Sequence, residues 1–302
     1  MIFEDQILSV QNMFKNSTET IVVEHINDRS MGSICYKHSE HAVQDLSIEG
    51  MNLKNIPDQV WALSQLQSLF VGNNALEYIA DNFSALPNLK ALYLYSNQLK
   101  QIPDSITTLR CLKILDLSHQ PLDKLPDDIG NLENLDILYC SNANLTDLPG
   151  SFWNLEKLTY LNLSNNHLIE IPDKIGGLKS LRELRFYNNA LTILPNQICY
   201  LDNLRELHLE GNQINKLPKE IGCLEKLEIL DLRSNRLTEI PESIQYAKNL
   251  LYLDLRSNPL TSLPDGMTRL TNLKKLDLRW TKLHAKPSWF DKLEQAGCII
   301  YS

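Results

Sequence analysis

The sequence has no apolar run that approaches the roughly 18 residues a helix needs to cross a membrane. At the amino terminus, Glu4 and Asp5 stand where a secretory signal has a basic patch followed by an apolar core. The composition is otherwise that of a soluble folded protein, with 43% hydrophobic and 22% charged residues. We therefore expect neither a membrane span nor export by the general secretory route.

Basic charge is scarce, and the formal net charge is -8. Nucleic-acid-binding proteins normally carry a basic stripe that gains from counterion release, and no such stripe is visible, so we expect no nucleic-acid partner. The six cysteines lie far apart, without the flanking clusters that staple the ends of secreted repeat proteins: Cys35, Cys111, Cys140, Cys199, Cys223 and Cys298. This spacing favours a reducing compartment and predicts a cytoplasmic protein.

The short motifs of common catalytic sites are missing as well, because the sequence holds no glycine-rich phosphate loop, nucleophile elbow or zinc-finger spacing. His38 and His41 are three residues apart, but no cysteine or carboxylate pattern completes a metal site, so we interpret them as solvated. His208 lies between Glu206 and Glu210 at alternating positions, and such triplets arise by chance. We expect no catalytic residue, no cofactor and no metal, and hence no enzyme.

What the sequence does contain is one unit of 23 residues repeated about eleven times. The leading position of the unit recurs without insertion or deletion at Val43, Leu66, Leu89, Leu112, Leu135, Leu158, Leu181, Leu204, Leu227, Leu250 and Leu273. Ten of the 13 prolines share one phase of the repeat, which scattered turn prolines would not do. Only Ala80 interrupts that proline column.

The shared pattern, LxxLxLxxNxLxxLPxxIxxL, resembles the leucine-rich-repeat superfamily, closest to its Ras-suppressor and scribble-like class and to bacterial repeat-only proteins. It covers residues 43–286, which leaves residues 1–42 as an N-terminal cap and residues 287–302 as a C-terminal cap. The resemblance implies an α/β fold, a right-handed solenoid or horseshoe with a parallel β-sheet on its concave face and short helical turns on its convex face. It implies a mode of binding and no particular partner.

The chemistry of the unit agrees with this resemblance. In Leu161-Asn162-Leu163 the alternation sends leucines to one face of a short strand and the intervening side chain to the other. An asparagine column follows, whose inward amides can satisfy backbone groups of neighbouring turns: Asn74, Asn97, Asn166, Asn189, Asn212, Asn235 and Asn258. Met51, Gln120, Ala143 and Thr281 depart from it. Because Gln120 and Ala143 occupy adjacent units, we predict a weaker ladder there.

The second half of each unit is too short for a long helix and predicts brief helical turns. In the N-terminal cap we expect an amphipathic stretch (Ile7, Leu8, Met13, Phe14) followed by a β-rich run from Thr20 to Val23. In the C-terminal cap we expect Ser288 to cap a helix from Trp289 to Ala296, Gly297 to end it, and residues 298–301 to add a last strand.

We call the outward side chains of the predicted sheet, the second, fourth and sixth residues after each leading leucine, the strand wall. Its first zone is an aromatic strip that we expect to face solvent: Phe70, Tyr93, Tyr95, Tyr139, Tyr160 and Tyr187. Exposed aromatics usually mark a contact surface, and tyrosine is common in interface hot spots. The alternative is that tyrosines suit strands and cover their neighbours across the sheet.

The second zone comes from three consecutive LDLR sequences and their surroundings: Asp231, Arg233, Asp254, Arg256, Asp277 and Arg279, with Tyr252, Trp280, Glu206, Arg185 and His208. Stacked units align aspartate over aspartate and arginine over arginine, so the like charges must be relieved by the neighbouring column or by a partner. Both interpretations stay open, because exposed ion pairs contribute only about 0–1 kcal/mol each.

We therefore interpret the chain as a non-enzymatic, cytoplasmic interaction module, a scaffold or signalling component that binds a protein or peptide along its concave wall. A first alternative is an adaptor, effector or inhibitor subunit that targets a host or signalling protein. A second is an enzyme whose site lies in the cap at residues 1–42, a hypothesis that deletion of the cap would test.

Overall fold

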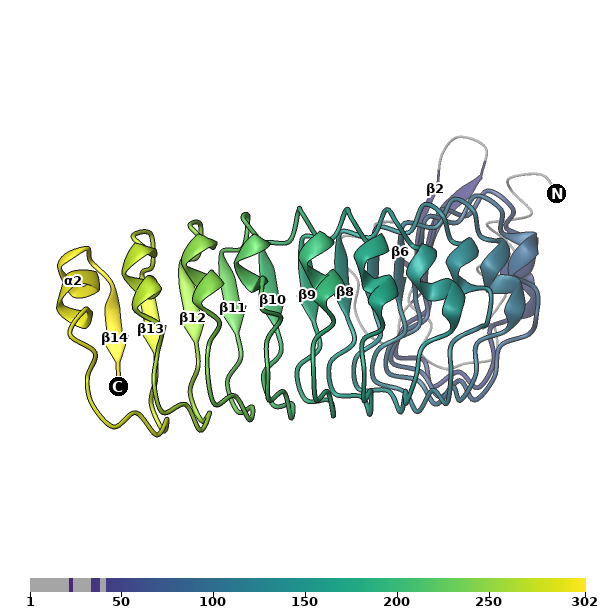
Figure 1. Ribbon diagram of the computed structural model, residues 1–302. Coiled ribbons are helices and arrows are strands. Elements are labelled where there is room, and N and C mark those ends of the chain that lie inside the picture. The colour runs from purple at the N-terminus through teal and green to yellow at the C-terminus, as the bar shows by residue number, and fades with distance from the viewer. Residues whose placement is uncertain (1–21, 24–33, 39–41) are drawn as a thin grey trace. The chain divides into compact units, whose positions relative to one another are not determined.

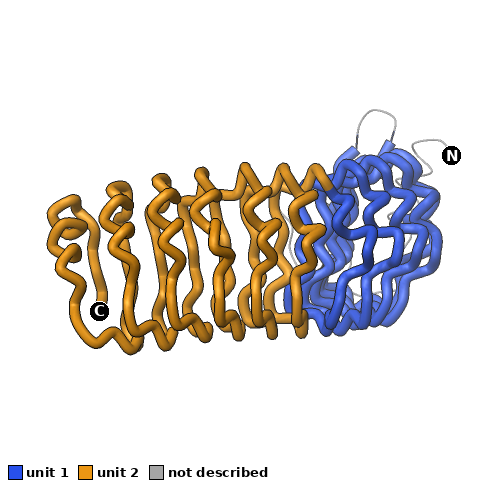
Figure 2. Tube along the Cα trace, in the orientation of Figure 1, with its two compact units in different colours: residues 1–155 blue, residues 156–302 orange. Residues whose placement is uncertain are grey.

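A computed structural model describes residues 22–23, 34–38 and 42–302 of the chain. They form two compact units, residues 1–155 (unit 1) and residues 156–302 (unit 2), which are coloured separately in Figure 2. Among the described residues, every helix is too short or too polar to span a bilayer. The amphipathic stretch expected at residues 7–14, together with Thr20, Ile21 and His41, lies outside the described residues.

Unit 1 holds strands that lie side by side in chain order. Their bounds are β1 (Val22–Val23), β2 (Ile34–His38), β3 (Val43–Ser47), β4 (Ser68–Phe70), β5 (Ala91–Tyr93), β6 (Ile114–Asp116) and β7 (Ile137–Tyr139). β3 to β7 are parallel, whereas β2 runs antiparallel to β3 and parallel to β1. The expected β-rich run before the first repeat is therefore present in part, as the two-residue strand β1.

Unit 2 repeats the arrangement, and all its strands are parallel in chain order (Figure 1). Their bounds are β8 (Tyr160–Asn162), β9 (Glu183–Arg185), β10 (Glu206–His208), β11 (Ile229–Asp231), β12 (Tyr252–Asp254), β13 (Lys275–Asp277) and β14 (Ile299–Tyr301). Corresponding residues pair directly, so that Leu184, Leu207 and Leu230 stack from strand to strand. These leucines are at most 1% exposed, and their stacking forms the core that no repeat could bury alone.

Short 3-10 turns return the chain from each strand to the next, as the second half of the repeat predicts. In unit 1 they are η2 (Asp58–Ala62), η3 (Phe83–Ala85), η4 (Asp104–Thr108), η5 (Ile129–Asn131) and η6 (Gly150–Asn154). In unit 2 they are η7 (Asp173–Gly177), η8 (Asn196–Tyr200), η9 (Ile221–Cys223), η10 (Glu242–Tyr246) and η11 (Asp265–Arg269). Pro172 shows the role of the proline column: its φ of −74° leads into η7, and its carbonyl accepts the N–H of Ile175 at 3.0 Å.

The asparagine column joins consecutive repeats through buried hydrogen bonds, as predicted. Asn235 donates from Nδ2 to the carbonyls of Leu209 and Leu232 at 2.9 and 3.0 Å. Its Oδ1 accepts the N–H of Ile214 at 3.0 Å. The same contacts recur at Asn189, Asn212 and Asn258. Each amide thus satisfies backbone groups of its own repeat and the preceding one, which water cannot reach.

The ladder is weaker where Gln120 and Ala143 replace asparagine, which confirms the prediction in chemical terms. Gln120 keeps one contact, from Nε2 to the Leu117 carbonyl at 2.9 Å, but its Oε1 is buried without a hydrogen-bond partner. The extra methylene of glutamine moves the oxygen away from the position that an asparagine oxygen takes. Thr281 retains part of the pattern, because its Oγ1 donates to the Leu278 carbonyl at 2.7 Å.

Replacing Gln120 with asparagine is expected to stabilise the protein by about 1 kcal/mol, because the shorter amide can satisfy its buried oxygen. Urea unfolding followed by circular dichroism measures the change. The matched control is Gln98→Asn, an exposed position where the change should stay within about 0.5 kcal/mol. A lower stability of Gln120→Asn would show that the longer side chain is the better fit.

A second periodic column, which the sequence analysis did not predict, lies at the end of each strand segment. Residues 23 positions apart have left-handed backbone conformations, with φ between 52° and 68°: Gly50, Asn73, Ser96, His119, Asn142, Asn165, Asn188, Gly211, Ser234, Ser257 and Trp280. Asparagine and glycine tolerate this region, whereas a bulky residue is strained there. At Gly211 a Cβ would also lie 2.2 Å from Asn188 Oδ1. Trp280 is the exception to this preference.

The carboxyl-terminal segment forms helix α2 (Phe290–Gln295) before β14. The expected cap by Ser288 is wrong, because Trp289 flanks the helix start without a side-chain cap hydrogen bond and Pro287 supplies the carbonyl that Phe290 N–H contacts at 3.1 Å. Gly297 ends the helix as predicted, with φ +89°. The chain then adds β14 in parallel to β13, which confirms the expected last strand.

Candidate functional site

In unit 1 the aromatic strip begins with a stacked pair. Phe70 and Tyr93 pair across β4 and β5, and their rings lie parallel at 8° with centroids 4.6 Å apart. Phe70 is only 8% exposed, so the expectation that it faces solvent is wrong. The register brings two flat side chains face to face, and each ring shields one side of the other.

Tyr95 is committed to contacts within unit 1. Its hydroxyl donates to Glu49 Oε1 at 2.7 Å and accepts a hydrogen bond from Asn73 Nδ2 at 3.2 Å. Its ring lies over Gly72, where an added Cβ would come within 2.5 Å of it. Tyr95 and Tyr139 are both half-buried. For Tyr95 the structure thus favours the interpretation in which wall tyrosines cover their neighbours.

In unit 2 the strip continues with Tyr160 and Tyr187, which are half-buried. The guanidinium of Arg185 lies 5.8 Å from the centre of the Tyr160 ring and forms an ion pair with Glu183. Burial lowers the pKa of Arg185, but the hydrogen bond to Glu183 outweighs this effect and raises the pKa above its ordinary value. A charged guanidinium therefore lies within cation–π distance of the aromatic side chain.

The aspartate and arginine columns neutralise each other within unit 2. Arg256 Nε donates to both oxygens of Asp254 at 2.9 Å and lies 3.4 Å from Asp277 on the next strand. Arg279 donates to Asp277 at 2.9 and 2.7 Å. Asp277 is fully buried, and burial alone would raise its pKa. The contacts with Arg279 and Arg256 outweigh this effect and hold the pKa of Asp277 below its ordinary value. At Asp254 and Asp277 the like charges therefore need no partner for their relief.

Asp231 departs from this pattern. Arg233, which follows it on the wall, forms its ion pair with Glu210 instead. Among the described residues Asp231 accepts the backbone N–H of Arg233 at 3.0 Å and has no ion pair. Burial, reinforced by the charge of Asp254, raises the pKa of Asp231, with the Arg233 N–H opposing the change. Within the described part of the chain Asp231 therefore has no direct ion pair beside His208, its cross-strand neighbour, although the charge of Arg256 also acts on it.

Replacing Asp231 with asparagine is expected to raise stability at pH 7 by less than about 1 kcal/mol, because a half-buried carboxylate is partly screened by solvent. A raised pKa in the folded state means that the wild type loses stability as pH rises from about 4 through that pKa, since the folded state binds more protons than the unfolded one. The variant should lack this loss in urea titrations between pH 3.5 and 8. The control is Asp254→Asn, which breaks the ion pair with Arg256 and should lower the stability of the protein. If both variants changed the stability equally, the difference we infer between Asp231 and Asp254 would be wrong.

An exposed cluster lies on β12, β13 and β14 and on the residues that directly follow β13, and we call it the C-terminal aromatic patch. It consists of Tyr252, Lys275, Arg279, Trp280, Ile299 and Tyr301. Trp280 is 71% exposed, and the other apolar members are between 40% and 59% exposed. The Arg279 guanidinium lies 5.5 Å from the Trp280 ring and 5.2 Å from the Tyr301 ring. The patch therefore presents two aromatic rings joined by a fixed cation.

Trp280 also has a strained backbone. Its φ of 60° lies in the left-handed region, where the equivalent residue of the neighbouring repeats is serine, glycine or asparagine. A large side chain there costs free energy that an exposed position does not return through packing. The contact with the Arg279 guanidinium is the stabilising interaction that the described residues show for the Trp280 ring.

Comparison with known families decides the class of the chain. Residues 98–195 and 192–296 match the family described as leucine-rich repeat region, and residues 41–99 match the family described as leucine rich repeat. The matches cover most of the chain. It belongs to the leucine-rich-repeat family.

Solved structures agree with this assignment. A leucine-rich-repeat protein of Leptospira interrogans is 32% identical over 82% of this chain and 75% of its own, with a TM-score of 0.59. The ectodomain of the Arabidopsis thaliana receptor kinase GASSHO1/SCHENGEN3, solved in complex with Casparian strip integrity factor 2, is 25% identical with a TM-score of 0.68. This match covers 90% of our chain and 34% of that one. The functional domain of Listeria monocytogenes InlJ, 24% identical, shares the fold with a TM-score of 0.74 over 86% of this chain and 53% of its own. No curated protein sequence matches the chain.

The sequence did not identify three members of the C-terminal aromatic patch: Lys275, Ile299 and Tyr301. The signal was present, because the predicted last strand continues the parallel stack and its alternate residues must share the face of Lys275. The register confirms this, pairing Lys275 with Ile299 and Asp277 with Tyr301. Of the residues named from the sequence, Tyr252, Arg279 and Trp280 are in the patch.

Proposed function

We propose that this leucine-rich-repeat protein is a non-enzymatic interaction module that binds a protein or peptide on the strand wall of unit 2, anchored at the C-terminal aromatic patch. The observation that carries the proposal is Trp280, an exposed tryptophan held in a strained left-handed conformation. Strained residues persist where the surrounding structure or a function requires them.

The chemistry of the patch supports a protein partner. Tryptophan, tyrosine and arginine dominate interface hot spots, since they bury large areas with few rotatable bonds. Here Arg279 is held by Asp277 and lies against both rings, so little side-chain freedom remains to be lost on binding. The aromatic strip in unit 1 contributes less, because Phe70 is buried and Tyr95 is hydrogen-bonded internally.

The relatives support the same class of function. The GASSHO1/SCHENGEN3 ectodomain was solved with a bound factor, and a receptor of similar fold, 24% identical, was solved as the complex PEPR1-AtPEP1. Another fold relative, FLRT2, belongs to an octameric complex with Latrophilin 3 and Unc5D. Binding of peptides and proteins by such solenoids is the precedent for our proposal, whereas the partner of this chain and its binding face are inferred from its own residues.

Two steps test the proposal. Affinity capture from a lysate of the source organism, with mass-spectrometric identification, supplies the partner. Titration calorimetry with the purified partner then compares the wild type with Tyr252→Ala/Tyr301→Ala. The matched control is Tyr200→Ala/Tyr246→Ala, which removes two exposed tyrosines from the 3-10 turns η8 and η10.

We expect the wall variant to weaken binding at least about tenfold and the turn variant to leave it unchanged. Loss of affinity in the turn variant alone would place the site on the other side of the repeats. Failure to capture any protein would count against an interaction module of any kind.

A further inference from the structure

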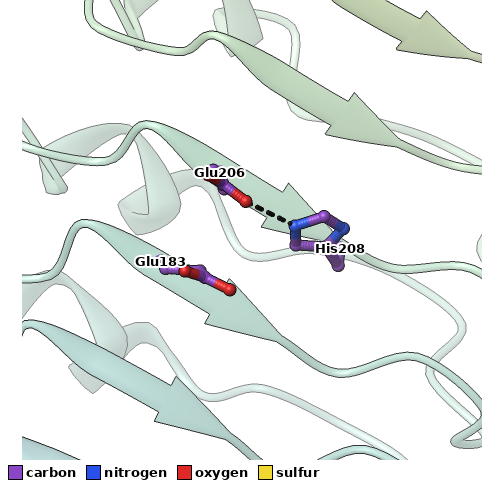
Figure 3. Close-up of side chains that lie close together, drawn as sticks. All are labelled: Glu183, Glu206 and His208. Atoms are coloured by element: carbon purple, nitrogen blue, oxygen red, sulfur yellow. Dashed lines mark hydrogen bonds and ion pairs between the residues drawn. The ribbon is translucent and has the colours of Figure 1, made fainter.

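Glu183 on β9 and Glu206 and His208 on β10 bring three metal-ligating side chains together on the wall of unit 2 (Figure 3). Each offers one ligand atom, and these atoms lie within 4.8 Å of one another. Their placement follows from the backbone, because Glu206 pairs with Glu183 in register and His208 lies two residues further along the same face. All three side chains are half-buried.

The spacing suits a small divalent ion. His208 Nε2 lies 3.0 Å from Glu206 Oε2, within hydrogen-bond distance. Two ligands about 2.0–2.1 Å from a tetrahedral zinc ion are about 3.3 Å apart, close to this separation. A carboxylate oxygen of Glu183 lies within 4.8 Å of both atoms. An imidazole with carboxylates favours zinc over calcium or magnesium, which prefer oxygen-only shells.

The surroundings hold the third ligand in place. Arg185 forms an ion pair with Oε1 of Glu183, which orients the carboxylate and leaves its other oxygen to accept a metal. Supporting contacts of this kind are typical of metal sites, where partners outside the ligand shell fix the ligand side chains.

The charge distribution of the wall is an independent reason to expect a cation here. The carboxylates of Glu210, Asp254 and Asp277 are paired with arginines. Asp231, the cross-strand neighbour of His208, lacks such a pair among the described residues. Glu206 has His208 as its sole ion-pair partner there, and a histidine is charged only when protonated. Two carboxylates without an arginine ion pair among the described residues, those of Glu206 and Asp231, are therefore neighbours of His208.

We propose that Glu183, Glu206 and His208 bind a zinc ion, with Asp231 adding negative charge from the next strand. Three protein ligands leave a fourth position for water or for a group of a binding partner. The proposal revises the sequence-based expectation that His208 belongs to a chance triplet, since Glu210 pairs with Arg233 and Glu183 takes its place in the cluster. It does not depend on the function of the aromatic patch.

Titration calorimetry of the metal-free protein with zinc chloride at pH 7.5 tests the site without any partner. We expect one zinc ion per chain, and His208→Ala should weaken its binding by at least about tenfold, since loss of an outer-shell contact alone costs 10–100-fold. Glu206→Gln, which preserves shape, is the second variant in case His208→Ala is misfolded. His167→Ala is the histidine control, because that residue is exposed outside the cluster.

A thiol control is also needed, because Cys223 Sγ donates to the Cys199 carbonyl at 3.7 Å and two neighbouring thiols can also bind zinc. Cys199→Ser/Cys223→Ser should retain the one-to-one binding. With cobalt in place of zinc, the wild type should show visible d–d bands without the near-ultraviolet band of a thiolate complex. Unchanged zinc affinity in both cluster variants, or loss of binding in the thiol variant, would overturn the proposal, as would the absence of one-to-one binding by the wild type.

Discussion

Replacing Asn235 with alanine is expected to lower the free energy of unfolding by about 2–4 kcal/mol. The change removes an amide that is 6% exposed and that holds the Ile214 N–H and the carbonyls of Leu209 and Leu232. Each buried backbone group left without a partner costs about 1–3 kcal/mol, and water cannot replace the amide in a closed stack of leucines. Urea unfolding at constant m-value measures the loss.

Asn249→Ala is the matched control for this prediction. Its side chain also contacts the preceding repeat, through one hydrogen bond from Nδ2 to the Glu225 carbonyl at 2.7 Å, but it is exposed. Solvent replaces that contact, so the loss should remain below about 1 kcal/mol. Equal losses in the two variants would mean that the buried ladder is no more important to the fold than a surface contact between repeats.

The second large effect is expected at Trp280, where replacement by asparagine should change stability and binding in opposite directions. Other repeats have asparagine at the position equivalent to Trp280, as Asn142, Asn165 and Asn188 show, and asparagine tolerates the left-handed conformation. Relief of this strain should stabilise the protein by about 0.5–1 kcal/mol. Loss of the exposed ring should weaken partner binding by about 30-fold or more, the range of a hot-spot residue.

Trp280→Tyr separates the two effects, because it keeps an aromatic ring and the strain. This control should bind with an intermediate affinity and gain no stability. If Trp280→Asn binds the partner as well as the wild type does, the tryptophan has no function in recognition. If the variant is less stable than the wild type, the account of its backbone strain is wrong.

The regular features of the fold could be predicted from the sequence because each depends on one residue type at one phase. A leucine column stacks and an asparagine column bonds to backbone wherever the repeats are in register, and Gln120 shows the effect of a single added methylene. The left-handed column was missed because asparagine, serine, glycine, histidine and tryptophan share no side-chain property there. Only the backbone conformation unites them.

The candidate site was harder to predict, because exposure and pairing depend on how side chains of adjacent strands meet. Phe70 occupies an outward position but is buried against Tyr93. Arg233 and Arg256 occupy equivalent positions, yet one pairs with a glutamate of the preceding repeat and the other with Asp254 and Asp277. The position of a residue within the repeat identifies the face of the sheet on which its side chain lies. It does not identify the residue with which that side chain interacts. The cytoplasmic location, the domain boundaries and the roles of the wall residues stay predictions.

The most direct test of the proposed binding wall is site-specific photo-cross-linking. A photoreactive phenylalanine derivative is placed at Tyr252 on the wall, or at Tyr246 on η10 as the control, and the protein is irradiated with its captured partner. Both tyrosines are exposed, at 46% for Tyr252 and 55% for Tyr246, so both probes are accessible in the free protein. We expect a cross-linked complex from position 252 and none from position 246. A complex formed from position 246 alone would contradict this expectation.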